Sequence, residues 1–402
     1  MRGTTLLARF GSYNFHIIDI ALILCCIMIP FSGPFRINSA SKTSLMIFVF
    51  IFLLSLIRTI YLPNFFVRFA TLRPAALFVA LIVVSILQEP DRRDAAVYCR
   101  IFEFFGILFC GFEVLRLIFG PLFLTNREFT GIIVYNTGRP LGAFSALVLT
   151  ICAVWRLLIA FRADQAANAN RNILKYFGFS IFVVLSGQRT TMIAWALASA
   201  AAIAFALPRL WKTSPVFTLA LVALCTIGAI ASFSDNAWNT LIHLNYSSAH
   251  ADTFSTRTEI WRSLLSVSRD WPLFDKAFGA PVGAELNLRV SGVQRYWENG
   301  MHSAYFGPIP LSGYVGAAAL TGAVLIGLIG AIGALWGGAK ENEFGLTPDE
   351  VIVLDVLILI FGISYDWFGF IGIWLVLIAG KWPPLAARRA RMSWTDTRIP
   401  AP

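Results

Sequence analysis

Long apolar stretches separated by short polar connections cover most of the chain. They lie at residues 17–31, 44–60, 74–87, 97–123, 141–161, 173–185, 191–207, 215–233, 309–335, 351–363 and 367–379. A helix needs about 20 mostly apolar residues to cross the hydrocarbon core of a bilayer. The stretch at 97–123 contains Glu113 and Arg116 and is followed by an apolar patch at 129–135, which predicts two short helices there. The pattern therefore predicts an all-α polytopic membrane protein with about twelve transmembrane helices.

The composition supports the same class of protein. Hydrophobic residues make up 57% of the 402 residues, and charged residues make up 13%, against about 25% in soluble globular chains. Such a composition cannot build a water-facing surface, so soluble enzymes, secreted toxins and nucleic-acid binders are excluded. The net charge of +10 does not indicate a nucleic-acid partner, because the excess Lys and Arg lie in the short connections, as the positive-inside rule describes.

The distribution of basic residues also predicts the topology. An even number of helices places both ends of the chain on one side, and the basic residues of the last segment indicate that this side is the cytoplasm. The predicted parts are a cytoplasmic N-terminus at 1–16, helices one to nine at 17–233, an outer loop domain at 234–308, helices ten to twelve at 309–380 and a basic cytoplasmic tail at 381–402.

The outer loop at 234–308 is expected to be folded. It carries many Trp, Tyr and Phe residues, too many for a disordered tether. Thr256 and Glu259 match a capping box, and the apolar residues that follow recur at helical spacing. This predicts a short helix with Arg257 as its first helical residue.

Three arginines are expected on the outer face, where the topological bias does not explain them. Arg257 at a helix start would offer a guanidinium beside free backbone N–H groups, which suits a phosphate; alternatively it is a solvated cation paired with Glu259. Arg189 lies in a tight break between two apolar stretches, where a snorkelling residue is the alternative. Arg139 lies at the outer end of another stretch. Three cations on one face predict an anion site.

His302 and Asp366 are the titratable candidates near the same face. His302 comes just before the tenth predicted helix, and a neutral imidazole can act as a general base, although a structural hydrogen bond is the commoner role. Asp366 lies at the hairpin between the last two helices and can reach the same pocket. His243 and His250 are spaced too loosely to indicate a metal site, so neither a metal nor another cofactor is expected.

Four motifs give the chain a resemblance to the O-antigen ligase and polymerase superfamily of bacterial envelope glycosyltransferases. G-R-P-L-G-A-F at 138–144 is similar to the family's G-R-x-x-G-x-F, and S-G-Q-R at 186–189 to its S-x-x-R. R-T-E-I-W at 257–261, with P-L-F and then Gly279 beyond it, resembles the R-x-x-x-W that opens the large outer loop. H-S-A-Y-F at 302–306 resembles H-N-x-x-L, with Ser303 in place of Asn and an unusual G-P-I-P at 307–310.

The resemblance implies metal-independent, inverting glycosyl transfer on a multi-helix fold in the bacterial inner membrane, with the active site facing the periplasm. Its donor is an undecaprenyl-diphosphate-linked glycan, so that glycan and membrane lipid are the expected partners, and a chain-length regulator is a candidate partner. The expected catalytic residues are His302, Arg257 and Arg189. The expected substrate-binding residues are Arg139, Glu259, Trp261, Tyr305 and Asp366.

Three functions agree with these residues. We favour a polymerase that joins lipid-linked repeat units into an exopolysaccharide or O-antigen. A ligase that delivers finished glycan to lipid A core uses the same donor and differs in its acceptor. A flippase for lipid-linked oligosaccharides is the alternative from another class. Transport predicts ionisable groups near the bilayer midplane, whereas the charged candidates here gather at the outer face.

Overall fold

The computed structural model describes residues 6–10, 13–31, 37–61, 65–119, 143–163, 165–186, 188–213, 253–281, 286–290, 293–297, 303–367 and 370–383. Most of these residues are helical. The helices are α1 (Ile17–Met28), α2 (Ala40–Ile60), α3 (Phe65–Leu87), α4 (Asp94–Phe119), α5 (Ala143–Arg162), α6 (Ala166–Leu185), α7 (Arg189–Thr213), α10 (Thr253–Arg269), α11 (Leu273–Phe278), α12 (Pro308–Trp336), α13 (Pro348–Ser364) and α14 (Ile371–Ile378), with a 3-10 turn η1 (Ile29–Phe31) after α1.

Two short antiparallel hairpins accompany the helices. One pairs β1 (Leu6–Phe10) with β2 (Tyr13–His16), and the other pairs β3 (Leu286–Val290) with β4 (Val293–Trp297). The sequence pattern did not predict either hairpin. Both lie outside the apolar stretches, so they add small elements to a helical membrane protein without changing its class.

The described helices confirm a helical membrane protein but do not confirm the predicted number of spans. Within the described residues, four helices are long and apolar enough to cross a membrane: α2, α4 over Asp94–Leu115, α5 and α12. Three shorter apolar helices lie at Ile18–Phe31, Arg73–Leu87 and Thr190–Ala206. The count of about twelve is therefore not confirmed, and the apolar stretches at 129–135 and 215–233 lie outside the described residues.

The prediction of two short helices within 97–123 is wrong. α4 is one continuous helix of 26 residues that includes Glu113 and Arg116. The Glu113 side chain is 2% exposed and has an interaction partner, so this carboxylate is accommodated by packing and does not end the helix. The charged residues within this apolar stretch therefore do not mark the end of a helix.

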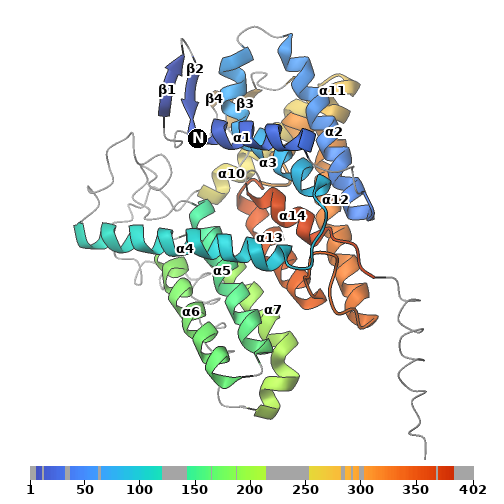
Figure 1. The fold of residues 1–402 in the computed structure, drawn as a ribbon. Helices are drawn as coiled ribbons and strands as arrows, with labels where there is room; N and C mark the ends of the chain where they lie inside the picture. Colours follow the sequence, from blue (N-terminus) through green and yellow to red (C-terminus); the bar gives the residue numbers. More distant parts are fainter. Residues whose placement is uncertain are drawn as a thin grey trace, which may run out of the picture.

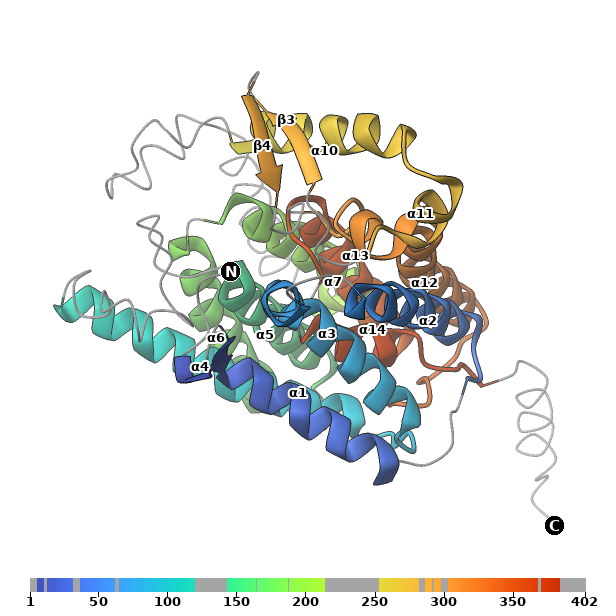
Figure 2. The same ribbon diagram turned by 90° about the horizontal axis from the view of Figure 1, so that it is seen from above.

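The helices pack around one large apolar core to which α2, α3, α4, α5, α6, α7, α12, α13 and α14 contribute. Its largest buried side chains include Phe48, Phe78, Phe361, Trp367 and Trp374. In Figure 1, α5, α6 and α7 extend below α4, while α12, α13 and α14 lie beside them. Figure 2 shows α10, α11 and the β3–β4 hairpin together along one side of this bundle.

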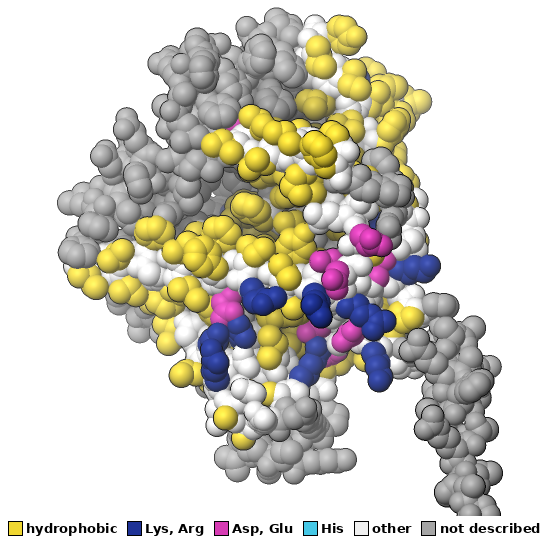
Figure 3. Space-filling view, in the orientation of Figure 1, with side chains coloured by type: hydrophobic (Ala, Val, Ile, Leu, Met, Phe, Trp, Pro, Cys, Tyr) yellow, Lys and Arg dark blue, Asp and Glu magenta, His cyan; other side chains and the backbone are white. Residues whose placement is uncertain are grey.

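α4 presents an apolar surface on the outside of the bundle. Many of its large hydrophobic side chains are exposed: Val97, Ile101, Phe104, Phe105, Ile107, Leu108, Val114, Leu115 and Ile118. Figure 3 shows hydrophobic side chains along this helix, with Lys, Arg, Asp and Glu side chains gathered below it. An exposed apolar band bordered by charges is typical of a surface that contacts lipid tails and headgroups.

Ion pairs hold the beginning of α13 against α5. Arg162, the last residue of α5, bonds Asp349 at 2.7 Å and Glu350 at 2.5 Å. The same two carboxylates lie in the first turn of α13, where negative charge is favourable. α13 is therefore fixed at its first residues, and its last residues lead directly into the candidate site described below.

A break in α12 receives the loop helix α11. Gly313 has φ 64° and ψ −172° inside α12, and a Cβ there would lie 2.3 Å from the carbonyl of Ala277. Gly279, with φ 86°, also lies close to the α12 backbone, because a Cβ there would lie 2.7 Å from the backbone of Leu311 and Ser312. Arg58 of α2 donates to the Gly279 carbonyl at 2.7 Å and to Asp275 at 2.5 Å. The two glycines and this arginine therefore attach the loop segment to the helical bundle.

Candidate active site

Segments from three distant parts of the sequence meet at the two residues that follow α13. We call Tyr365 and Asp366 the Tyr365/Asp366 corner. The ring of Tyr365 stacks on Phe361 at a centroid separation of 4.9 Å and an interplanar angle of 24°. Phe361 is fully buried, so the corner is fixed to the core of the protein.

The first segment at the corner is the turn between α6 and α7. Gln188 is buried and accepts a hydrogen bond from the Tyr365 hydroxyl at 2.6 Å. The buried Ser186 hydroxyl donates to the Val183 carbonyl at 2.6 Å and accepts from the Gln188 N–H at 3.3 Å. The serine of the S-x-x-R motif therefore ends α6 and shapes the turn, and the arginine of the motif, Arg189, is the first residue of α7.

The second segment is the approach to α12, directly after His302. The Ser303 N–H donates to Asp366 Oδ1 at 3.2 Å, and the Ser303 hydroxyl donates to the Gly362 carbonyl at 3.3 Å. The Ala304 N–H also donates to Gly362, at 2.8 Å. Gly307 leaves no room for a side chain, because a Cβ there would lie 2.2 Å from Asp366 Oδ1. This segment is thus bonded along the end of α13.

The third segment is α10, which brings Arg257 to the corner. The Arg257 guanidinium lies over the Tyr365 ring, with its carbon 5.1 Å from the ring centroid. α10 is held by an apolar cluster that includes Ile260 and Leu264 from α10, Leu288 from β3 and Ile309 from α12. The hairpin and the start of α12 therefore determine where Arg257 lies.

The predicted start of this helix is wrong. α10 begins at Thr253, so Arg257 lies in its second turn rather than at the first helical position. The free N–H groups of a helix end are not beside Arg257, and Thr256 does not cap the helix. The helix N-terminus therefore cannot contribute to a phosphate site at Arg257. The Arg257 guanidinium is the only part of that hypothesis that still applies.

Asp366 gives the corner a titratable carboxyl group. Its side chain is 7% exposed, and burial raises the pKa of Asp366 to about 7, while the Ser303 N–H and the charge of Arg257 act to lower it. Because a buried carboxylate is costly without partners, these two groups stabilise its ionised form. Asp366 and Arg257 therefore act on one another electrostatically, as expected for two groups of one site.

Two of the expected substrate-binding aromatics have protein partners. Trp261 stacks on Phe306 with centroids 5.1 Å apart and an interplanar angle of 17°. The Tyr305 hydroxyl donates to the Leu359 carbonyl at 2.6 Å, and burial raises the pKa of Tyr305 to about 12. Both side chains are half-buried and hold the segments around the corner in place.

The remaining predicted residues lie in different relations to the corner. Glu259 is exposed on α10. His302 and Arg139 lie outside the described residues, as does the side chain of Arg189, although the neighbours Gln188 and Ser303 both bond the corner. Sequence reasoning missed Tyr365, Gln188 and Ser303, each of which directly adjoins a residue that it selected.

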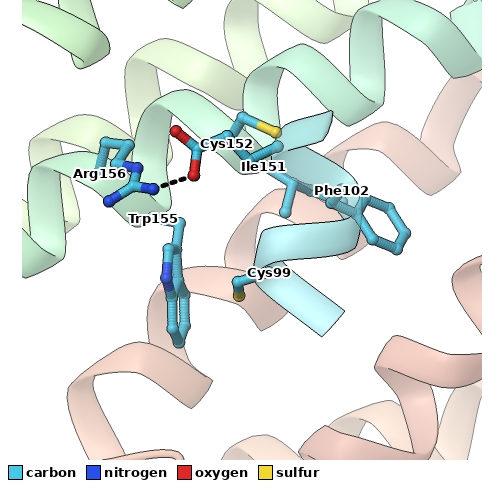
Figure 4. Close-up of a pocket in the computed structure, with 7 residues that line it drawn as sticks. Cys99, Phe102, Ile151, Cys152, Trp155 and Arg156 are labelled. Carbon is cyan, nitrogen blue, oxygen red and sulfur yellow. Dashed lines mark hydrogen bonds and ion pairs between the residues drawn. The ribbon is translucent and has the colours of Figure 1, made fainter. Parts of the chain in front are cut away.

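A separate small pocket lies between α4 and α5. It is lined by Cys99, Phe102, Glu103, Ile151, Cys152, Trp155 and Arg156, and Figure 4 shows the Arg156–Glu103 ion pair at one side. Lys175 of α6 also bonds Glu103, at 2.7 Å, and Asn172 accepts from Arg156 at 2.9 Å. These bonds join three helices, and none of the lining residues belongs to the Tyr365/Asp366 corner.

Among the described residues, no group of three or more His, Cys, Asp or Glu side chains is placed to hold a metal ion. His243, His250 and His302 lie outside that part of the chain. At the corner, the described residues include the guanidinium of Arg257 and the carboxyl group of Asp366.

The fold and the corner define a multi-pass helical membrane protein whose candidate site joins an arginine and a buried carboxyl group between helix ends. The family described as O-Antigen ligase matches residues 176–321, so this stretch of the chain is similar to that family, and the match supports the resemblance to the O-antigen ligase and polymerase superfamily. Members of the family are membrane glycosyltransferase-like enzymes. The matched stretch includes Gln188, Arg257 and Ser303, whereas the corner itself lies beyond its end. A comparison with curated proteins finds no match.

Proposed function

We propose that this protein transfers a glycan from an undecaprenyl diphosphate donor to an acceptor hydroxyl at the periplasmic face of the inner membrane. The observation that carries the proposal is the convergence at the Tyr365/Asp366 corner. Arg257 lies over Tyr365 at 5.1 Å, Gln188 bonds Tyr365 at 2.6 Å, and Ser303 bonds Asp366 at 3.2 Å. Gln188 and Ser303 immediately adjoin Arg189 and His302, so the three proposed catalytic residues come from segments that meet.

The proposed reaction is a displacement at the anomeric carbon of the donor sugar. The acceptor oxygen forms a bond to this carbon from the face opposite the diphosphate, which inverts the configuration. The bond to the diphosphate oxygen breaks, and its electron pair remains on the diphosphate. Arg257 and Arg189 stabilise the negative charge that develops there, more strongly in the transition state than in the ground state.

The proton of the acceptor hydroxyl passes to His302 in this proposal. A neutral imidazole is suited to this step near neutral pH. Asp366 supports it indirectly, because its carboxyl group holds the N–H of Ser303, the residue next to His302. Arg139, Glu259, Trp261 and Tyr305 remain proposed substrate-binding residues around the same face.

For the acceptor, we propose a second lipid-linked repeat unit, which makes the protein a polymerase of an exopolysaccharide or O-antigen. A ligase that uses lipid A core is the second candidate, because the matching family is described as O-Antigen ligase. Both reactions use the same donor and the same charges, so only the acceptor differs.

The experiment compares glycans from cells that carry the wild-type chain, Arg257→Ala, Arg189→Ala or His302→Ala. Each variant should lose long glycan while the protein remains in the membrane at its normal level. Arg262→Ala is the matched control, since Arg262 is an exposed arginine on the same helix as Arg257. Arg257→Ala cells with wild-type glycan lengths would contradict the proposal.

The material that accumulates distinguishes the two acceptors. Loss of a polymerase leaves single repeat units, whether lipid-linked or attached to lipid A core. Loss of a ligase leaves long glycan on undecaprenyl diphosphate and none on lipid A core. Repeat units trapped on the cytoplasmic side would instead indicate transport, and would contradict glycosyl transfer.

A further inference from the structure

Tyr365 contacts two segments that each carry a proposed catalytic arginine. Its ring lies under the guanidinium of Arg257, 5.1 Å from centroid to guanidinium carbon. Its hydroxyl donates to the side chain of Gln188 at 2.6 Å, and Gln188 directly precedes Arg189. One side chain thus bonds both the loop helix α10 and the turn before α7.

We propose that Tyr365 is a positioning residue that sets the separation of Arg257 and Arg189 so that both reach one polyprenyl diphosphate. This inference rests on the function proposed above and assigns to Tyr365 a role that the family's motifs do not include, since they end before α13. Tyr365 itself does not touch the reacting atoms in this proposal.

The fixed position of Tyr365 suits this role. Its ring stacks on Phe361 at 4.9 Å, and Phe361 packs at 6.2 Å from Phe144 of α5. Phe361 is fully buried in the apolar core, so the ring of Tyr365 packs against the core of the bundle. α10 belongs to the loop segment, and the contact between Arg257 and Tyr365 connects it to the helical bundle.

The type of contact also matters for anion binding. An arginine paired in plane with a carboxylate commits two of its N–H donors to that partner. An arginine held through the face of an aromatic ring keeps its in-plane N–H groups directed at other acceptors. Contact with Tyr365 therefore orients Arg257 while leaving donors for phosphate oxygens.

The bond to Gln188 extends the same effect to the second arginine. Gln188 is 3% exposed. Its backbone carbonyl accepts a hydrogen bond from the N–H of Met192, in the first turn of α7, at 3.0 Å. The turn is further fixed by the Ser186 hydroxyl. A shift of Tyr365 would therefore move the start of α7, where Arg189 lies, together with Arg257.

The test measures binding of farnesyl diphosphate, a short polyprenyl diphosphate, to the full-length protein in lipid nanodiscs. Tyr365→Leu removes both the ring and the hydroxyl, and should weaken binding roughly threefold to thirtyfold, the range for loss of a cation–π contact. Tyr365→Phe keeps the ring and loses the bond to Gln188, so its loss should be about threefold. Farnesol, which has no phosphate, should bind all three proteins equally.

A matched control separates positioning from general packing. Arg58 lies over Phe274 at 4.8 Å, a second Arg–aromatic contact of similar geometry on the loop segment. Phe274→Leu should bind farnesyl diphosphate as the wild type does. In a transfer assay, Tyr365→Leu should lower kcat/KM more than Tyr365→Phe does. The thermal stability of both variants should stay close to that of Phe274→Leu.

Each other outcome overturns a specific statement. If Arg257→Ala weakens binding and both Tyr365 variants bind normally, Tyr365 does not position the arginines, although the proposed function stands. If the Leu variant loses farnesol and farnesyl diphosphate equally, its effect is structural and the inference is wrong. If Arg257→Ala binds farnesyl diphosphate normally, the proposed anion site itself is wrong.

Discussion

Removing the charge of Asp366 should make the protein more stable above neutral pH. Asp366 is 7% exposed, and burial raises its pKa from an ordinary value of 3.8 to about 7. The folded chain thus binds this proton more tightly than the unfolded chain does. The resulting stabilisation is fully present below about pH 4 and is lost as the pH rises to about 7.

The magnitude follows from the size of this difference. One pKa unit corresponds to about 1.4 kcal/mol, so a difference of about three units corresponds to about 4 kcal/mol between low and high pH. Asp366→Asn cannot ionise and keeps an oxygen that accepts from the Ser303 N–H. It should therefore lack this component of the pH dependence, and its advantage over the wild type should grow between about pH 5 and pH 8.

The assay is thermal unfolding of the purified protein in detergent, at several pH values between 5 and 8. The wild-type Tm should fall relative to that of Asp366→Asn as the pH rises. Asp270→Asn is the control, because Asp270 is an exposed carboxylate near the end of α10, and it should follow the wild type. Parallel Tm curves for the wild type and Asp366→Asn would refute the account of a buried, proton-binding carboxyl group.

Three further substitutions test the packing around the corner and the loop. Gly307→Ala would place a Cβ 2.2 Å from Asp366 Oδ1, so glycan transfer should fall on the order of tenfold to a hundredfold, while Gly333→Ala, with no atom within 4 Å, should transfer normally. Gly313→Ala forces a side chain into a positive φ of 64° and should lower the free energy of unfolding by about 1–3 kcal/mol in chemical denaturation; an unchanged denaturation midpoint would contradict it. Trp261→Leu removes a stacked ring pair and should increase protease cleavage within α10, consistent with a loss of about 0.5–1.5 kcal/mol; an unchanged cleavage rate would show that the stack contributes little.

The sequence predicted the helical class and the approximate places of most described helices, because apolar runs of this length have few other stable solutions. It failed where a local signal competed with packing. Glu113 and Arg116 suggested a break in α4, and the capping-box pattern at Thr256 suggested a helix that begins at Arg257, whereas α10 begins at Thr253. The hydropathy pattern does not show whether a polar or charged side chain has an interaction partner in the folded protein.

The candidate site was partly predictable. The motifs contain residues beside the segments that reach the corner, and Asp366 was predicted because it lies at the hairpin between the last two helices, within reach of the same outer pocket. Tyr365 and Gln188 were missed, because an aromatic and an amide next to apolar helices are ordinary in sequence. Their bond at 2.6 Å joins positions 177 residues apart, and one sequence contains no information on that proximity.

The most direct test of the central claim is an experimental structure of the full-length protein with undecaprenyl diphosphate bound. We predict that the diphosphate lies between the guanidinium groups of Arg257 and Arg189, beside the Tyr365/Asp366 corner, with the His302 imidazole facing the space for the acceptor. A diphosphate bound elsewhere, such as at Arg156 in the pocket between α4 and α5, or side chains of Arg189 and His302 turned away from Arg257, would contradict the account.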